Sequence, residues 1–356
     1  MKILMANSIR PEVWGGGEKW FLTAAAGLRR RGHEITAAGR RGSLFLARMG
    51  AAGHRVEGIR IRLDYGWGSI RRVRRIIRRE GIERVLLNVN KDLRTFGVAA
   101  RRERVPLVAC RHGARVFSDR WKDRFSARFV DRIIVNNLAL RDEYSRYPWL
   151  RGKPVIHLPN GIDPAPPSPA APLREKFSIP ESHLLILAAG RLSFEKGFDL
   201  LVSAAARLGS DPPFTVILAG EGPEEERIRR AASDLNLGKK LRLAGFQEDV
   251  RPWIAAADLV VLPSRHEGMP HILMEAMAEA KPTVAFRVGG VEELLGEGAG
   301  WLADPGDPGS LAGALQAAFA SAVERSARGR LARERVAERY SMEQMLDGLE
   351  KALELV

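Results

Sequence analysis

Short runs of consecutive apolar residues recur along the whole chain, and between them apolar residues return every three or four positions. The runs are typical of buried parallel strands, and the wider spacing is typical of amphipathic helices. In the first half the runs predict strands at 2–6, 33–39, 54–61, 84–89, 105–110, 132–136 and 154–157. The wider spacing predicts helices at 17–31, 43–51, 69–80, 92–102, 118–129 and 138–145. This alternation favours a doubly wound parallel sheet.

The same alternation returns in the second half of the chain. Its predicted strands are 183–190, 214–220, 240–246, 258–263 and 282–286. Its predicted helices are 197–208, 224–235, 250–256, 271–280, 291–295 and 309–325. The two halves therefore look like two copies of one α/β architecture.

The segment between the halves, from Asn160 to Pro172, holds five prolines and is not a regular element. We therefore predict a first domain at 1–163, a linker at 164–176 and a second domain at 177–340. The chain ends in an amphipathic helix, predicted at 341–356. Its apolar residues share one side: Met342, Met345, Leu346, Leu349 and Leu353.

Candidate chemistry gathers in the turns that follow strands, where open α/β sheets bind ligands. Glu267 lies in the turn after the strand at 258–263, and Glu275 lies about one turn into the next helix. The N–H groups at the start of that helix favour a phosphate. Two carboxylates around an anion-binding turn suit a nucleotide-sugar. The spacing alone fits two solvated glutamates equally well.

Two further turns carry groups that suit an anion. Gly15, Gly16 and Gly17 open the first helix, where glycine lets the backbone approach a ligand closely. Arg191 and Lys196 follow the strand at 183–190, and such cations can stabilise a leaving diphosphate. In isolation these patterns also fit a tight turn and two solvated charges. The absence of G-x-G-x-x-G counts against a redox dinucleotide domain.

The longer sequence motifs around these residues narrow the class of protein. EGMPHILMEAMA, followed by KPTVAF and GGVEELL, resembles the E-x7-E signature of the retaining GT-B glycosyltransferases of family four. GRLSFEKGFDLL resembles the GRL-x-x-x-KG motif of that family, and WGGGEKW resembles its GG-x-[EQ] loop. The matches run from residue 3 to about residue 345 in the expected order. The resemblance implies two Rossmann-like domains facing a cleft, with the acceptor site in the first, the nucleotide-sugar site in the second, and the final helix crossing back to the first.

The resemblance also implies the reaction and the roles of residues. A sugar would move from a nucleoside diphosphate, UDP before GDP, to a hydroxyl of a cell-envelope glycan or glycolipid, with retained anomeric configuration. As catalytic residues, Glu267 would stabilise positive charge on the sugar, and Arg191 with Lys196 would stabilise the diphosphate. His112, also expected to be a catalytic residue, would contact the transferred sugar, although a lone histidine is more often structural. Glu275 would bind ribose hydroxyls. The other expected donor-binding residues are Gly15, Gly16, Gly220, Phe246, Gly268, Met269, Pro270, His271, Ile272 and Leu273.

Composition sets further bounds. With 356 residues, 45% of them apolar, the chain fills two ordinary cores. A single cysteine, Cys110, excludes an intramolecular disulfide and fits a reducing cytoplasm. The first residues hold too short an apolar run for a signal peptide, and no apolar run of about 20 residues follows. No metal-ligand spacing and no D-x-D pair occur, so we predict neither a metal nor a cofactor.

The net charge of +14, with 46 arginines, suits anionic partners, although a GC-rich genome or a hot habitat would explain it equally. Two other classes of protein stay open. A nucleotide-sugar epimerase of the same fold normally needs additional acid and base groups, and no such set is visible. A nucleic-acid-binding protein would explain the charge but not the motifs, so no nucleic-acid partner is expected.

Two stretches favour docking on an anionic membrane, which would place the enzyme at the inner face of the membrane with a lipid-linked acceptor. Residues 69–80 hold six arginines and a small apolar side. Residues 117–129 place Phe117, Trp121, Phe125 and Phe129 four residues apart beside a basic stripe. The alternative is that the aromatic residues pack on the sheet, the arginines are solvated, and the enzyme is cytoplasmic with a soluble acceptor.

Overall fold

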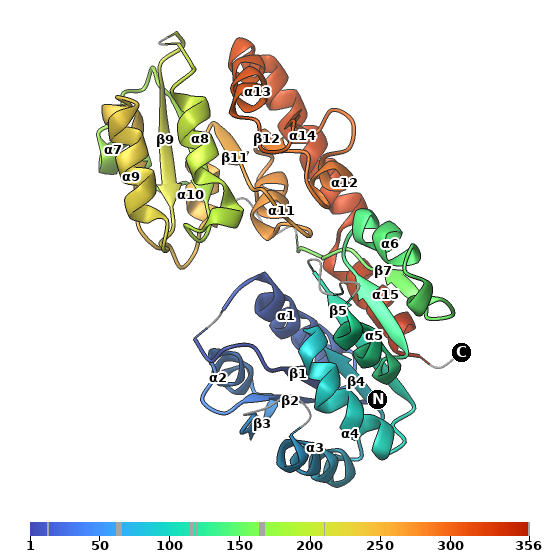
Figure 1. Ribbon diagram of the computed structural model, residues 1–356. Helices are drawn as coiled ribbons and strands as arrows, with labels where there is room; N and C mark the ends of the chain where they lie inside the picture. The colour runs from blue at the N-terminus through green and yellow to red at the C-terminus, as the bar shows by residue number, and fades with distance from the viewer. Residues whose placement is uncertain are drawn as a thin grey trace. The chain divides into compact units, whose positions relative to one another are not determined.

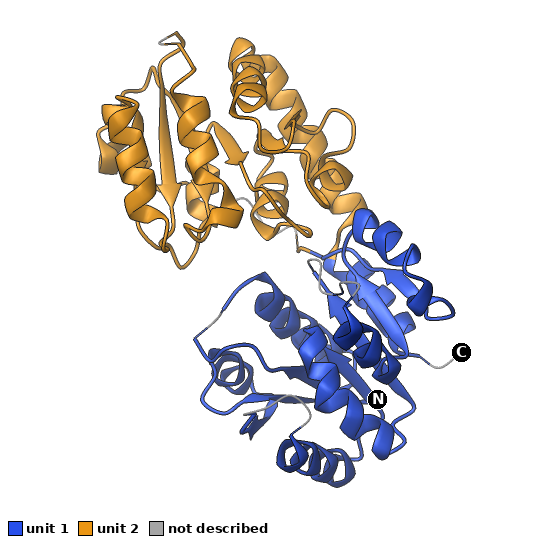
Figure 2. Ribbon diagram, in the orientation of Figure 1, with its two compact units in different colours: residues 1–161, 342–356 blue, residues 162–341 orange. Residues whose placement is uncertain are grey.

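The computed structural model describes residues 1–12, 14–61, 66–113, 117, 120–163, 168–209 and 211–354. The chain divides into two compact units (Figure 2). Unit 1 comprises residues 1–161 and 342–356, and unit 2 comprises residues 162–341. In the described part of the chain no helix is both long and apolar enough to cross a membrane.

The described residues of unit 1 form a seven-stranded parallel sheet in the order β3-β2-β1-β4-β5-β6-β7 (Figure 1). The strands are β1 (Lys2–Asn7), β2 (Glu34–Arg40), β3 (Arg55–Ile59), β4 (Arg84–Leu87), β5 (Leu107–His112), β6 (Arg132–Val135) and β7 (Val155–His157). Strand order reverses between β1 and β4, and open sheets of this kind bind ligands at that switch point.

Helices cover both faces of the unit 1 sheet. They are α1 (Gly16–Arg30), α2 (Leu44–Ala51), α3 (Trp67–Glu80), η1 (Asn90–Arg94), α4 (Phe96–Arg102), α5 (Trp121–Ser126), η2 (Ala127–Phe129), α6 (Leu138–Ser145), η3 (Pro148–Leu150) and α15 (Met342–Leu353). Alternation along β1 sends Leu4 into the core under α3, α4 and α6, and sends Ile3 into the core under α1, α2 and α15.

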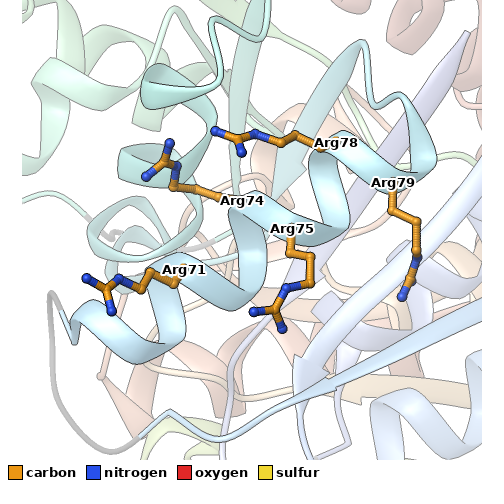
Figure 3. Close-up of a pocket in the computed structure, with 5 residues that line it drawn as sticks. All are labelled: Arg71, Arg74, Arg75, Arg78 and Arg79. Carbon is orange, nitrogen blue, oxygen red and sulfur yellow. The ribbon is translucent and has the colours of Figure 1, made fainter.

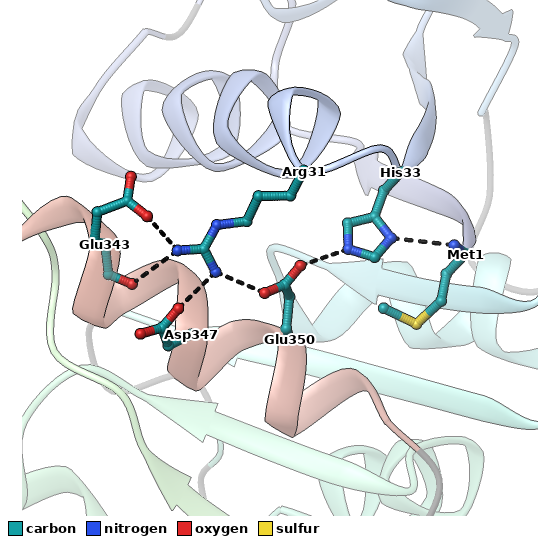
Figure 4. Close-up of polar contacts among 6 residues, drawn as sticks. All are labelled: Met1, Arg31, His33, Glu343, Asp347 and Glu350. Atoms are coloured by element: carbon teal, nitrogen blue, oxygen red, sulfur yellow. Dashed lines mark hydrogen bonds and ion pairs between the residues drawn. The ribbon is translucent and has the colours of Figure 1, made fainter.

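Helix α15 packs beside α1 through apolar contact and ion pairs. Leu346 lies so close to Gly27 of α1 that a Cβ there would sit 2.5 Å from Leu346 Cδ1. Arg31, which ends α1, pairs with Glu343, Asp347 and Glu350 (Figure 4). The close contact between Gly27 and Leu346 and the three ion pairs of Arg31 hold helix α15 in unit 1.

The described residues of unit 2 form a six-stranded parallel sheet in the order β10-β9-β8-β11-β12-β13. The strands are β8 (Leu184–Ala189), β9 (Phe214–Ala219), β10 (Leu241–Leu243), β11 (Leu259–Leu262), β12 (Thr283–Phe286) and β13 (Trp301–Ala303). The helices are α7 (Leu173–Phe177), η4 (Phe194–Lys196), α8 (Phe198–Ala205), α9 (Glu225–Asp234), η5 (Gly238–Lys240), α10 (Arg251–Ala256), α11 (His271–Ala278), α12 (Val291–Leu295), α13 (Pro308–Ala320) and α14 (Ala322–Arg339). Helices α8, α9 and α13 share one core, and α11, α12 and α14 share another.

Several elements differ from the sequence-based predictions. The predicted linker at 164–176 overlaps α7, whose Leu173 is buried in a core of unit 2, so the chain enters unit 2 at Ile162. Strand β13 and helix α14 were not expected. The helix predicted at 309–325 ends at Ser321, whose hydroxyl accepts from Glu324 N and starts α14.

The two stretches singled out for membrane contact also differ from expectation. The apolar residues of α3, Ile70, Val73, Ile76 and Ile77, are all buried in the unit 1 core. Phe117 is fully buried as well, and Phe129 packs against the same core. The apolar residues of α3 and Phe117 therefore do not form an interfacial stripe, whereas Phe129 is half-buried and Trp121 and Phe125 are exposed. Contact with a membrane stays a prediction.

Candidate functional site

Glycines draw together the turns at the carboxyl edge of the unit 2 sheet. Gly197 has φ of +63°, and a Cβ there would lie 2.0 Å from the carbonyl oxygen of Pro263. A Cβ on Gly220 would lie 1.9 Å from the carbonyl oxygen of Gly190, and Gly220 N donates to Gly245 O at 2.8 Å. Because a side chain would collide with the neighbouring backbone, only glycine fits at these contacts. The turns after β8, β9, β10 and β11 thus meet backbone to backbone.

The turn that carries Glu267 is held by the turn after β12. Gly289 has φ of +50°, and a Cβ there would lie 1.8 Å from the carbonyl oxygen of Glu267. Gly290 N donates to Gly268 O at 2.7 Å. The GGVEELL string therefore fixes the backbone of the E-x7-E turn.

Two predicted catalytic side chains meet on this edge. Lys196 Nζ lies 2.6 Å from Glu267 Oε1, and the buried Ser264 donates its hydroxyl to the same oxygen at 2.7 Å. The stem of Lys196 passes Gly190, the residue before Arg191. The Glu267 side chain is only 9% exposed and that of Lys196 30%, so the pair is desolvated enough for its charges to interact strongly. Ser264 was not predicted, since a serine after a strand gives no signal by itself.

An ion pair behind this turn keeps its backbone in place. Both nitrogens of the Arg265 fork lie 2.7 Å from the carboxylate of Asp199, and its guanidinium stacks 4.1 Å from the ring centre of Phe194. Burial acts to raise the pKa of Asp199, but the bonds and charge of Arg265 outweigh it and hold that pKa below its usual value. Arg265 N also donates to Glu195 O, which joins the β8 and β11 turns.

The other predicted donor residues lie on the same edge with unequal access. Arg191 and Phe246 are exposed, and Phe246 N donates to Glu221 Oε1 at 3.3 Å. His271 begins α11, with Ile272 and Glu275 half-buried on that helix. The other members of the segment are buried: Gly268, Met269, Pro270 and Leu273. The Leu273 side chain belongs to the core, so Leu273 offers a ligand only its backbone.

In unit 1, Gly15 caps α1 and Gly16 is exposed in its first turn. Glu18, in the first turn of the same helix, is buried. Its carboxylate accepts from Gly15 N at 3.0 Å, from Asn7 Nδ2 at 2.7 Å and from Asn88 Nδ2 at 3.2 Å. Glu18 thus ties the glycine turn to the ends of β1 and β4. Sequence reasoning missed it, although the family motif that the loop resembles includes this position.

His112 lies in a buried aromatic cluster. Its Nδ1 is 2.8 Å from the Tyr144 hydroxyl, its Nε2 is 3.2 Å from Cys110 Sγ, and Phe117 packs edge-on against the ring. Burial, with a smaller contribution from the charge of Arg111, lowers the pKa of His112 to about 3. The imidazole is therefore neutral, and contact with a sugar would require its ring to exchange one of these partners. Its sugar-binding role stays a prediction.

Arg111 is a buried cation that the sequence did not single out. Its Nη2 donates to Asn160 Oδ1 at 2.7 Å, and its guanidinium lies 4.2 Å over the Trp20 ring. Burial, opposed by the charge of Glu18, lowers the pKa of Arg111 to about 9. Such a group remains charged at neutral pH and needs the polar surroundings that this edge provides.

A buried acid completes the unit 1 edge. Ser8 N lies 3.2 and 3.3 Å from the two carboxylate oxygens of Asp92. Burial, only partly opposed by these bonds, raises the pKa of Asp92 to about 7. Within the described residues of either unit, no group of three or more His, Cys, Asp or Glu is placed to hold a metal.

Known protein families match both halves of the chain. The family model for group 1 glycosyl transferases matches residues 170–335, and the family model for glycosyltransferase family 4 matches residues 14–166. A lipopolysaccharide core biosynthesis glycosyltransferase, LpsE of Rhizobium meliloti, is 32% identical over 206 residues, which are 58% of this chain and 58% of that protein. The chain thus spans little more than half the length of this relative.

Two more relatives extend the match. A GDP-mannose-dependent mannosyltransferase of Corynebacterium glutamicum, which acts on a monoacylated phosphatidylinositol monomannoside, is 26% identical over 78% of each chain. HepE of Anabaena, solved in complex with UDP, superposes with a TM-score of 0.86 at 21% identity, over 99% of each chain. Both units thus have the Rossmann-like folds found in GT-B proteins. The chain belongs to the glycosyltransferases of the GT-B fold and the family-four type.

Proposed function

We propose that the protein is a retaining hexosyltransferase. It moves a sugar from a nucleoside-diphosphate sugar to a hydroxyl of a cell-envelope glycan or glycolipid. The observation that carries the proposal is the pairing of Lys196 with Glu267 on a glycine-clamped turn at the start of α11. Family membership and the lipopolysaccharide and glycolipid roles of the named relatives support the acceptor class.

In the proposed reaction, each of the three charged side chains has its own role. The acceptor oxygen bonds to the anomeric carbon while the bond from that carbon to the diphosphate breaks, and the hydroxyl proton leaves on the diphosphate. Arg191 and Lys196 stabilise the negative charge that grows on the leaving group. When Lys196 turns to the diphosphate, Glu267 keeps its bond from Ser264 and places its carboxylate near the positive anomeric centre.

Retention is tested by the anomeric configuration of the product, followed by NMR from a donor of known configuration. If the enzyme is retaining, the product has the same anomeric configuration as the donor. A product of opposite configuration contradicts it and leaves the family assignment untouched.

The donor is proposed to be a UDP-sugar, with a GDP-sugar as the alternative, and a thermal-shift panel of nucleoside diphosphates and their sugars decides between them. Glu275, half-buried on α11, is assigned to the ribose hydroxyls. Glu275→Ala should weaken nucleotide binding by about 1–3 kcal/mol, because buried hydroxyls lose an acceptor. Unchanged affinity in calorimetry would remove this assignment.

We assign the stabilisation of the diphosphate to Arg191 and Lys196 rather than to a metal ion. Both cations lie on the turn after β8, where a guanidinium and an ammonium can track phosphate charge. Activity should therefore survive removal of divalent metal by a chelator. Activity that disappears with chelator and returns with Mg²⁺ would place a metal in the reaction.

We further propose that unit 1 docks on the inner face of an anionic membrane through an aromatic pocket of about 480 Å³. Its lining residues are Trp121, Arg124, Phe125, Ala127, Arg128, Trp149 and Lys153. Trp121 is 72% exposed and Phe125 38%, and both line the same pocket; exposed apolar side chains that are grouped in this way mark contact surfaces. Aromatic rings surrounded by cations suit the interface between headgroups and acyl chains.

Vesicle sedimentation tests this attachment with anionic and neutral lipids at low and high salt. Trp121→Ala/Phe125→Ala should reduce binding to anionic vesicles. The control Val323→Ala/Leu331→Ala, which removes exposed apolar side chains from α14, should not. If the wild-type protein ignores anionic vesicles at low salt, a soluble enzyme with a soluble acceptor is the better description.

A further inference from the structure

Helix α3 carries more positive charge than its neighbours neutralise. Arg55 and the six arginines of α3 face three glutamates among the described residues. Each glutamate serves two arginines: Glu57 pairs with Arg72 and Arg79, Glu80 with Arg55 and Arg79, and Glu103 with Arg74 and Arg78. Like charges this close repel one another, so an added anion lowers the free energy of this surface.

Five of these residues line a hollow of about 490 Å³, which we call the arginine pocket: Arg71, Arg74, Arg75, Arg78 and Arg79. Figure 3 shows Arg74 and Arg78 leaving one side of the helix and Arg75 and Arg79 leaving the other. Their spacing of three and four residues places neighbouring side chains about 5–6 Å apart at Cβ. The helix is held rigidly beneath them, because its apolar side is buried in the core.

Two of the guanidiniums are available without breaking an ion pair. Arg71 and Arg75 are exposed and have no hydrogen bond or ion pair to the part of the chain that the structure describes. Their partners in the pocket, Arg74 and Arg78, share the single carboxylate of Glu103, with Arg78 Nη2 at 2.9 Å from its Oε1. One glutamate leaves most of the donors of those two forks unused.

We propose that the arginine pocket binds a phosphate group that carries two or more negative charges, either a phosphomonoester or a diphosphate. Guanidinium forks match phosphate oxygens bidentately, and a phosphomonoester brings nearly two charges and three acceptor oxygens at pH 7. The described lining is arginine alone, with no aromatic or aliphatic residue to hold an acyl chain or a sugar ring. In this respect it differs from the aromatic pocket. The ligand is thus recognised by charge and oxygen geometry.

The residues of the arginine pocket are not those assigned to the transfer reaction. Helix α3 belongs to unit 1, whereas Arg191, Lys196 and Glu267 belong to unit 2. The phosphate has two sources with the same chemistry: a lipid headgroup, or a phosphorylated soluble glycan.

Calorimetric titration with inorganic pyrophosphate tests the site. Because the donor turn also attracts diphosphate, the titration uses full-length protein with Arg191→Ala/Lys196→Ala as background. Adding Arg71→Ala/Arg75→Ala should lower pyrophosphate affinity by about tenfold or more. The control Arg330→Ala/Arg339→Ala removes the same charge from exposed positions on α14 and should leave that affinity within about twofold.

A second arm separates the two phosphate sources. Vesicles with phosphatidic acid and with phosphatidylserine are compared at equal surface charge. Preference for phosphatidic acid, lost in Arg71→Ala/Arg75→Ala, identifies a headgroup site. Saturable pyrophosphate binding without that preference identifies a soluble phosphate. Equal loss in the α14 control, or binding to pyrophosphate, single-stranded DNA and both lipids that disappears together with modest salt, overturns the proposal and leaves a general polyanion-binding surface.

Discussion

The carboxyl edges of the two sheets are built in different ways. In unit 2, glycine turns bring backbone against backbone, and the charged side chains stand partly in solvent above them. In unit 1, the same edge is filled by buried polar side chains: Glu18 with two asparagines, Arg111 with Asn160, and Asp92 with the backbone of Ser8. The unit 2 edge offers charge to a ligand, whereas the unit 1 edge uses most of its polar groups to hold its own shape.

The difference predicts where substitutions act. At the unit 2 edge, a change in backbone space should cost stability and a change in charge should cost activity. At the unit 1 edge, removal of a buried hydrogen-bonding group should cost stability first, because its partners stay buried without it.

The largest change in free energy is expected for the unfolding of Gly289→Ala. The new Cβ would meet the Glu267 carbonyl oxygen, and φ of +50° is unfavourable for alanine. Left-handed strain of about 1–2 kcal/mol and a backbone shift of about 1–3 kcal/mol add together. Denaturant unfolding should show this loss. Gly238→Ala is the matched control, since Gly238 has φ of +49° with no atom within 4 Å. Equal losses in both variants would show that close approach contributes nothing.

Next in size are Arg191→Ala and Lys196→Ala. Each should lower kcat/KM by about 10²-fold, or roughly 2.7 kcal/mol, because the leaving diphosphate loses a cation. The unfolding free energy should change little for the exposed Arg191. Steady-state kinetics and unfolding are measured on the same preparations. Activity within a few-fold of wild type for both variants would make them ordinary surface charges.

Much of the unit 2 site could be predicted from sequence because its residues stand in continuous strings. Glu267, Gly268 and Glu275 occupy one turn and one helix, and Arg191 and Lys196 occupy another turn. The ion pair between Lys196 and Glu267 could not be predicted, because it joins positions 71 residues apart. It depends on how closely Gly197 lets the two turns approach.

Most of the polar network at the unit 1 edge could not be predicted, because its residues do not stand in continuous strings. Its network joins single residues from the ends of separate strands, and an asparagine after a strand carries no signal of its own. Phe117 was misread because spacing of four assumes one continuous helix, whereas it precedes α5 and packs on His112. Helix α14 was missed because its buried positions are small, Gly329 and Ala332 among them, so its apolar periodicity is faint.

Glu18→Ala tests the buried network at the unit 1 edge. Three donors, from Asn7, Asn88 and Gly15, would lose their acceptor in a buried place. We expect a loss of about 1–3 kcal/mol in unfolding free energy. Glu18→Gln keeps one acceptor oxygen and should recover part of it. Wild-type stability of Glu18→Ala would mean that water replaces the carboxylate.

The last prediction concerns the pH dependence of stability in Asp92→Asn. Burial raises the pKa of Asp92 from 3.8 to about 7, so the fold favours the protonated acid. The stability this group contributes is therefore complete below about pH 4 and declines as pH rises through 7. Asparagine keeps an acceptor for Ser8 N and does not ionise. Relative to wild type, the melting temperature of Asp92→Asn should thus rise between pH 5 and pH 8, by roughly 2–4 °C for each kcal/mol. Parallel melting curves across that range would show that the carboxylate is solvated or paired in solution.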